Sequence, residues 1–414
     1  MSKNIGLITL CGLIIGPILG SGIVLLPPIA YLNIGEWAIL AWIIIMLLGI
    51  VFAYVFTFLS LESPGNEGVA IAVGNTLGFF FRELCSNFLT TAVCFGPVAV
   101  LITASTFLKN IYFFKNSKIE WIAFALIIIC ILLLIRGVKS IGKFNLIFTG
   151  LTSVILLCGS IYTLIFASNF HVPKTPFLFS KFGYTLLLLF WAIVGWEIVG
   201  NYIEDIKNPK KTLMKAMTIS LIVIICLYLI VALSLQNFNG NTYDIISIMT
   251  PLFGSFAMPV IVIMASGLCV STYLMIVGGV TRMSAKRSEN NKLPSYLSKL
   301  NKNESPVYAI LTMSCIHCFM LILVSFNVLT LDSLVSSANV FFLSNAIIGL
   351  LAGFKLLKSI KLKIFILILI TSFALLIFKA DIWSKLLLIL VFLLSLYKNT
   401  NTLLSSLFKS SFKQ

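Results

Sequence analysis

Glu197 is the one acidic residue that lies well inside a predicted apolar span, at the end of the sequence Phe-Trp-Ala-Ile-Val-Gly-Trp-Glu. An ionised carboxylate is costly in hydrocarbon, so such a residue faces a cavity or stays protonated. It could carry a proton or bind a substrate ammonium group. Alternatively, it could be a neutral carboxyl that hydrogen-bonds unwound backbone and fixes a helix break. Glu197 is therefore our candidate for proton coupling, with a structural role left open.

A second feature is the interrupted sequence Gly-Pro-Ile-Leu-Gly-Ser-Gly at residues 16–22 of the first apolar run. Pro17 removes a backbone donor, and the glycines tolerate non-helical torsions. If the helix unwinds here, the amides of Ser21, Gly22 and Ile23 begin a second half-helix. Unpaired amides and the helix dipole at such a position attract an anion, for example a carboxylate.

The same run has a second interpretation, because Gly12, Gly16 and Gly20 are spaced four apart and could form a stripe for close helix packing. The sixth apolar run favours the binding interpretation, since it places two tryptophans, a glycine and the carboxylate in mid-span: Trp191, Gly195, Trp196 and Glu197.

Metal or catalytic chemistry is not indicated by the remaining polar residues. His317 lies between Cys315 and Cys318, but this spacing on one helix splays the ligands and no fourth ligand is evident, so packing is expected. His171, His317 and Glu197 do not form a convergent set of catalytic groups. We therefore expect no enzyme activity, no metal site and no cofactor.

The elements that must position these residues are membrane spans. Hydrophobic residues make up 60% of the 414, charged residues make up 10%, and the mean hydropathy is +1.10, as expected for one membrane domain with little soluble structure. Apolar runs long enough to span a bilayer occur at residues 5–32, 36–61, 79–108, 119–135, 144–168, 184–203, 213–235, 256–281, 306–326, 331–353, 362–378 and 382–397.

The two interrupted runs are the first and the sixth, which are corresponding positions in a transporter built from two five-helix halves of inverted topology. The sequence therefore predicts an all-α integral membrane protein of about twelve helices with broken helices 1 and 6. The expected transmembrane domain covers 1–397. Its core helices lie in 5–353, two peripheral helices lie in 362–397, and 398–414 forms a short cytoplasmic tail.

The net charge of +16 has a topological explanation. If the N-terminus is cytoplasmic, 22 of the 29 Lys and Arg fall on inner segments, as positive-inside sorting requires. Both termini are then cytoplasmic, and the inner lysines could contact anionic lipids. No basic soluble module is present, so a nucleic-acid partner is not expected. The nine cysteines show no paired spacing on outer loops, so disulfides are not expected either.

Several motifs resemble those of the amino acid–polyamine–organocation superfamily. Residues 20–23 (Gly-Ser-Gly-Ile) with Pro27 resemble its G-[ST]-G-I-F-x-x-P signature. Residues 63–68 resemble its loop after helix 2, and residues 204–211 resemble its E-x-x-N-P-x-R segment after helix 6. The match covers nearly the whole chain.

Within the superfamily, residues 190–197 and Ala338-Asn339 are most similar to the bacterial methionine and branched-chain amino acid exporter branch. The resemblance implies the leucine-transporter fold, with substrate held between helices 1, 3, 6, 8 and 10. It also implies a set of substrate-binding residues: Gly20, Ser21, Gly22, Ile23, Phe190, Trp191, Val194, Gly195 and Trp196. For Trp191 and Trp196, the alternative role is packing or an interfacial belt.

The function that the resemblance implies is secondary active transport of neutral aliphatic amino acids such as methionine, leucine, isoleucine and valine, across the bacterial inner membrane by alternating access. We expect proton-linked transport or exchange, with export favoured. The alternatives are a membrane-embedded amino acid sensor, or uptake of a different amine or amino acid. Sodium coupling through Ser271 and Thr272 is less expected, because helical hydroxyls usually bond local carbonyls. Helix 5 has no lysine at the position that serves proton coupling in some relatives.

Overall fold

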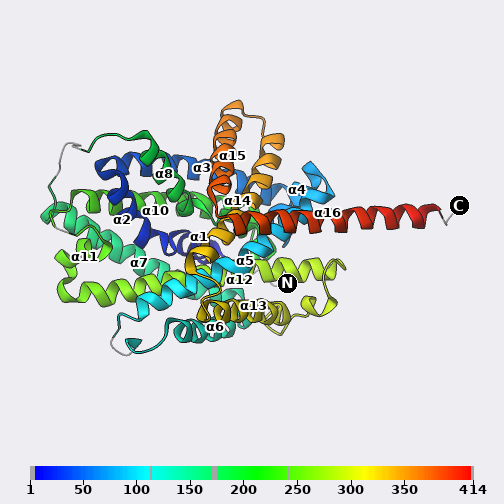
Figure 1. Cartoon of the computed structure of the whole chain (residues 1–414), viewed down its shortest axis with the longest axis horizontal. Coiled ribbons are helices and arrows are strands. Elements are labelled where there is room, and N and C mark those ends of the chain that lie inside the picture. The colour runs from blue at the N-terminus through cyan, green and yellow to red at the C-terminus, as the bar shows by residue number, and fades with distance from the viewer. Residues whose placement is uncertain (1–4, 112–113, 170–174, 241, 412–414) are drawn as a thin grey trace.

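The computed structural model describes residues 5–111, 114–169, 175–240 and 242–411, with side chains described up to residue 399. Within these ranges the chain is helical, and most of the long helices run along the long axis of the molecule (Figure 1). The α-helices are α1 Leu7–Leu19, α2 Gly22–Ile34, α3 Ala38–Glu62, α4 Val69–Leu77, α5 Phe79–Leu108, α6 Ile119–Ile135, α7 Val138–Phe166, α8 Phe179–Leu189, α9 Trp196–Val199, α10 Pro209–Asn237, α11 Ile245–Phe253, α12 Ala257–Glu289, α13 Val307–Ser325, α14 Leu331–Leu356, α15 Ile360–Lys379 and α16 Ile382–Ser411. The short 3-10 helices are η1 Gly35–Trp37, η3 Phe190–Ile193, η4 Gly200–Asp205, η5 Gly254–Phe256 and η6 Ser295–Ser298.

Each of the twelve predicted spans corresponds to a helical passage. In the described chain, ten stretches are long and apolar enough to cross a membrane, and the first, Leu7–Glu62, contains two passages. The remaining passage is the shorter apolar helix α6. Two helices, α4 and α11, fall where the sequence predicted connections. The side chain of Asp244 caps α11 by accepting a hydrogen bond from the Ser247 amide at 2.7 Å.

The predicted break in the first span is confirmed, and it separates α1 from α2. Gly20 has φ 42° and ψ −140°, a backbone conformation open almost only to glycine. The second predicted break is confirmed in the sixth span. Val194 is extended there, with ψ 141°, and Gly195 has φ 126°, so η3 ends and the short helix α9 starts anew.

The glycine stripe on α1 also packs closely, so the two interpretations of this run are compatible. A Cβ on Gly12 would lie 2.7 Å from the Leu146 Cα of α7, and a Cβ on Gly16 would overlap the hydroxyls of Thr149 and Ser271. Close approach at these glycines lets α1 occupy the centre of the molecule, against α7, α10 and α12 (Figure 1).

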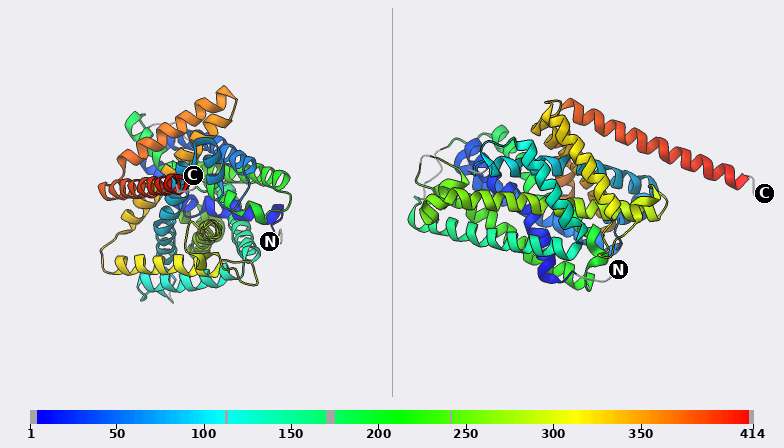
Figure 2. Two further views of the ribbon diagram at one scale, coloured as in Figure 1. Left: turned by 90° about the vertical axis from the view of Figure 1, so that its right-hand side faces the viewer. Right: turned by 90° about the horizontal axis from the view of Figure 1, so that it is seen from below.

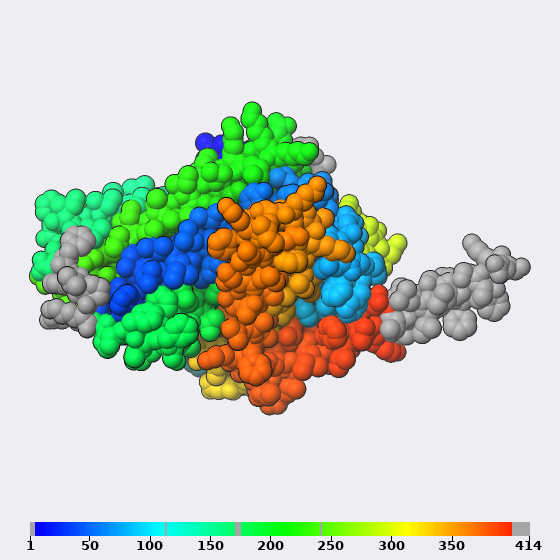
Figure 3. Space-filling model, turned by 90° about the horizontal axis from the view of Figure 1, so that it is seen from above, coloured from blue at the N-terminus to red at the C-terminus, as the bar shows by residue number. Residues whose placement is uncertain are grey.

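The last two helices, α15 and α16, lie at the periphery. Figure 3 shows α15 (orange) on the surface of the body, and Figure 2 shows α16 projecting beyond it. Only 17% of the α15 span and 11% of the α16 span are buried, which fits helices that present most of their surface to lipid. The expected boundary at residue 397 is not a helix end, because α16 continues to Ser411.

Candidate functional site

A cavity of about 590 Å³ lies between the two broken helices and the helices α5, α14 and α15. Most of its wall is apolar, with a few polar groups at separate places, among them Ser21, Thr103, Ser336 and Asn339. A largely apolar cavity with a few placed polar groups is the usual form of a small-molecule site.

Five of the residues predicted for substrate binding line this cavity together: Ser21 and Gly22 from the first break, and Phe190, Trp191 and Val194 from the second. The two breaks face each other closely, because a Cβ on Gly22 would lie 3.7 Å from the Trp191 Cδ1. The structure therefore brings together two residues that are 169 positions apart in the chain.

The amides at the start of α2 have no hydrogen-bond partner within the described chain. Those of Ser21, Gly22 and Ile23 donate to no protein acceptor there, as expected for the first turn of a helix. The last two carbonyls of α1 have a side-chain partner. The Tyr228 hydroxyl of α10 lies 3.3 Å from the Ile18 oxygen and 3.4 Å from the Leu19 oxygen, and can donate to either.

Sequence reasoning missed Tyr228, and it also missed most of the wall that α5 and α14 provide. Tyr228 is fully buried, and its ring stacks on that of Trp42 with 4.6 Å between the ring centroids, so it is held against the first break. Nothing in the local sequence of α10 marks Tyr228. By contrast, Asn339 belongs to the Ala-Asn pair that carried the family resemblance.

The other predicted residues surround the cavity without forming its wall. Gly20 and Gly195 set the backbone at the two breaks, while Ile23 and Trp196 are buried in the core, with 0% and 4% of their surfaces exposed. The Trp196 side chain packs in the core and does not face the cavity.

Glu197 is buried, with 2% of its surface exposed, and lies in the first turn of α9. Its Oε2 accepts a hydrogen bond from the Gly195 amide at 3.0 Å, while its Oε1 has no partner among the described residues. The carboxyl thus bonds the unwound backbone, as the structural interpretation requires. One oxygen remains available for a proton or another polar group.

The sodium candidates lie next to the first break, where α12 contacts α1. The Thr272 hydroxyl lies 2.9 Å from the Leu268 oxygen and 3.3 Å from the Pro17 oxygen, and the Ser271 hydroxyl is buried with no partner among the described residues. Thr272 therefore makes the local bond expected of a helical hydroxyl. The described part of the chain contains no cluster of His, Cys, Asp or Glu that could hold a metal ion, and His171 lies outside it.

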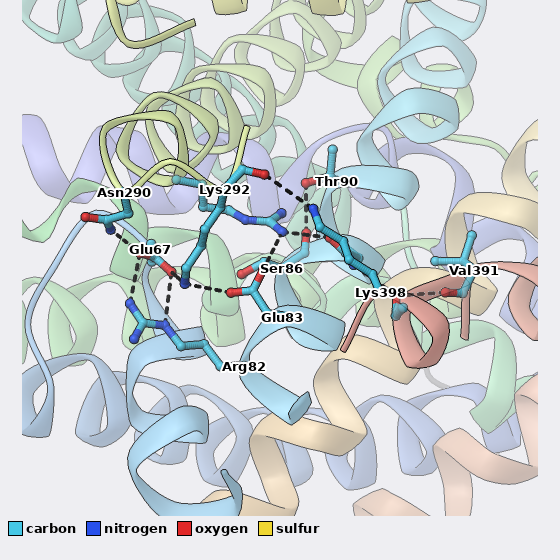
Figure 4. A network of polar contacts seen from close by, with 12 residues as sticks. Glu67, Arg82, Glu83, Ser86, Thr90, Asn290, Lys292, Val391 and Lys398 are labelled. Carbon is cyan, nitrogen blue, oxygen red and sulfur yellow. Dashed lines mark hydrogen bonds and ion pairs between the residues drawn. The ribbon is translucent and has the colours of Figure 1, made fainter. Parts of the chain in front are cut away.

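One end of the molecule carries a network of paired charged side chains, drawn in Figure 4. Glu83 of α5 pairs with Arg287 at 3.0 Å and with Lys292 at 2.6 Å, and Glu67 pairs with Arg82 at 2.9 Å. Close to the start of α1, Asp205 pairs with Arg282 of α12 at 3.2 Å.

The cavity reaches toward the opposite end, where its wall includes Asp332 at the start of α14 and Lys379 at the end of α15. The molecule thus has paired charges at one end and a cavity that extends toward the other end.

The twelve helical passages of the described chain, its two discontinuous helices and the cavity at their breaks define a multi-pass transporter of small solutes. The amino acid permease family model matches residues 5–405, and the chain belongs to that family. The predicted resemblance is thereby confirmed, and the class of function is amino acid transport.

Individual relatives agree with this assignment. The chain is 23% identical to the L-methionine/branched-chain amino acid exporter YjeH of Escherichia coli (strain K12), over 86% of this chain and 87% of that protein. It is 24% identical to the serine/threonine exchanger SteT of Bacillus subtilis (strain 168), over 71% and 70%. The crystal structure of MhsT in complex with L-phenylalanine superposes with a TM-score of 0.64 at 14% identity, covering 92% of this chain and 100% of that one, which shows the leucine-transporter fold.

Proposed function

We propose that this protein is a secondary active transporter of neutral aliphatic amino acids that works by alternating access, as an exchanger or in a proton-linked mode, with export favoured. The observation that supports the proposal most strongly is that both helix breaks line one largely apolar cavity. Half-helix N-termini and unwound carbonyls at such breaks suit the two charged groups of an amino acid.

In this proposal the free amides of Ser21, Gly22 and Ile23 bind the substrate carboxylate, with Gly20 setting their direction. Carbonyls near Phe190 and Val194 accept from the ammonium group, and Trp191 forms a wall beside the side chain. Leu25, Val340 and Leu343 supply further apolar wall. An apolar wall accepts aliphatic side chains but discriminates weakly between side chains that differ by one methylene.

Coupling has two candidate sites. Glu197 could take up a proton while it holds the Gly195 amide, and the hydroxyls of Ser271 and Thr272 could join carbonyls of α1 around a sodium ion. We favour the proton, because Thr272 already bonds local backbone. The bacterial relatives support an inner-membrane location, and the charge asymmetry supports an orientation with both termini cytoplasmic.

The test is efflux of preloaded radiolabelled methionine and leucine from proteoliposomes that contain the purified protein. We expect external unlabelled methionine or leucine to accelerate efflux, and an imposed pH gradient to change its rate. Lysine and cadaverine serve as competitors, since the Escherichia coli cadaverine/lysine antiporter is 23% identical to this chain over 78% of its length.

Acceleration by lysine or cadaverine, with no response to methionine or leucine, would contradict the aliphatic specificity. Saturable binding of either amino acid without any counterflow, in folded protein, would favour the sensor alternative.

A further inference from the structure

Helix α5 contains a proline in its middle, Pro97, directly after Gly96. Proline has no N–H group, so the carbonyl of Val93, four residues earlier, loses its helical donor, and the proline ring also pushes that carbonyl outward. Val93 is fully buried. A buried carbonyl without a partner would be costly, so a donor from elsewhere is required.

His317 of α13 supplies this donor. Its Nε2 lies 2.8 Å from the Val93 oxygen, and because a carbonyl can only accept, the hydrogen must be on Nε2. Nδ1 is then the acceptor of the neutral ring, and the Tyr273 hydroxyl of α12 donates to it at 2.9 Å. Both side chains are fully buried. The ring thus has one tautomer and both of its nitrogens are used.

The part of α5 around Pro97 lies beside the cavity. A Cβ on the preceding residue, Gly96, would lie 3.3 Å from Ala338 and 3.2 Å from Phe342 of α14, and Phe342 lines the cavity. Just after the proline, Ala99, Val100 and Thr103 of α5 line it as well. The path of α5 around Pro97 therefore sets the position of one part of the wall of the cavity that the two helix breaks also line.

We propose that His317 is a positioning residue for transport: it replaces the missing amide of Pro97 and holds the stretch of α5 that lines the substrate cavity. The proposal rests on the proposed transport function, and it assigns a role to a buried histidine that neither the cavity nor the helix breaks require. The histidine acts through Val93 and touches no substrate.

The test is a double-mutant cycle with His317→Leu in the parent and in a Pro97→Ala background, where residue 97 has its own amide for Val93. In the parent we expect His317→Leu to raise the KM for radiolabelled methionine about tenfold. In the Pro97→Ala background the same substitution should change the KM less than about twofold. Thermal unfolding of the four proteins is measured in parallel, and we expect the loss of Tm from His317→Leu to be smaller in the Pro97→Ala background.

His317→Gln keeps a donor near Val93 and should retain a KM within about twofold of the parent, while Met313→Leu on the same helix controls for general repacking. An equal rise of KM in both backgrounds, or a lower Tm with an unchanged KM in the parent, would overturn the proposal. If methionine is not a substrate, the Tm values of the four proteins still show whether His317 and Pro97 are coupled. Equal Tm losses from His317→Leu in the parent and in the Pro97→Ala background would overturn the proposal. Failure of transport in the parent alone would count against the proposed function.

Discussion

At the scale of single residues, Glu197 has the position for two roles, a structural one and the proposed coupling one. Its Oε2 holds the Gly195 amide at the second break, so the residue is part of the architecture. Its Oε1 is buried and has no partner among the described residues, and such an atom in a low-dielectric site is suited to binding a proton. A substitution that separates the two functions is therefore informative.

We predict that Glu197→Gln separates them. The Gln side-chain oxygen can still accept from Gly195, so exchange of methionine should remain within about threefold of the parent, but the pH gradient should no longer change the rate because the amide cannot titrate. Efflux with and without the gradient measures both. Glu197→Leu is the comparison, since it removes the acceptor and should impair exchange itself. A full pH response in Glu197→Gln would leave Glu197 with the structural role alone.

At the scale of elements, the break between α1 and α2 depends on Gly20, a position that only glycine occupies without strain. At Gly20 a Cβ would lie 2.9 Å from the Pro17 oxygen and 3.0 Å from the Thr272 hydroxyl, in addition to the strained φ of 42°. The chain provides a matched control in Gly150 of α7, where a Cβ would have nothing within 4 Å.

We predict that Gly20→Ala lowers the free energy of unfolding by about 1–3 kcal/mol and weakens methionine binding, because the free amides of Ser21 and Gly22 are redirected. Gly150→Ala should be neutral or slightly stabilising, since alanine favours a helix over glycine. Thermal unfolding and binding of radiolabelled methionine measure both effects. Equal behaviour of the two variants would show that the break tolerates a side chain.

At the scale of the whole molecule, the end with the paired charges lies opposite the end toward which the cavity extends. Asp205 is the last residue of η4 in the broken sixth span, and its partner Arg282 belongs to α12, so this pair joins two parts that must separate if the cavity is to open at this end. Their side chains are 8% and 5% exposed. Removal of one partner would leave the other charge buried without compensation.

We predict that Asp205→Asn or Arg282→Gln alone lowers the free energy of unfolding by about 3–5 kcal/mol, and that the double variant recovers a large part of this loss. Unfolding of the parent, the two single variants and the double variant in detergent measures the coupling between the two side chains. Lys286→Gln with Glu289→Gln, an exposed pair on α12, should show almost no coupling. Additive losses at Asp205 and Arg282 would mean that the two side chains do not stabilise each other.

The sequence by itself determined the class of fold, because its signals are local. Long apolar runs must become helices in lipid, where each backbone group needs an internal partner, and this fixed the number of passages. The positions of the two breaks were also predictable, since Pro17, Gly20 and Gly195 alter the backbone wherever the helix lies. The motif at residues 20–23 then correctly predicted the family.

Only the tertiary structure decided which side chains meet. The rotation of a span about its axis and its choice of neighbours depend on packing between helices, and a span that is apolar on all faces carries little periodic signal of either. For this reason Trp191 faces the cavity while Trp196 is buried, and the amide that Glu197 holds was not predictable. For the same reason Tyr228 at the first break, and His317 at the carbonyl freed by Pro97, become visible only when the helices are assembled.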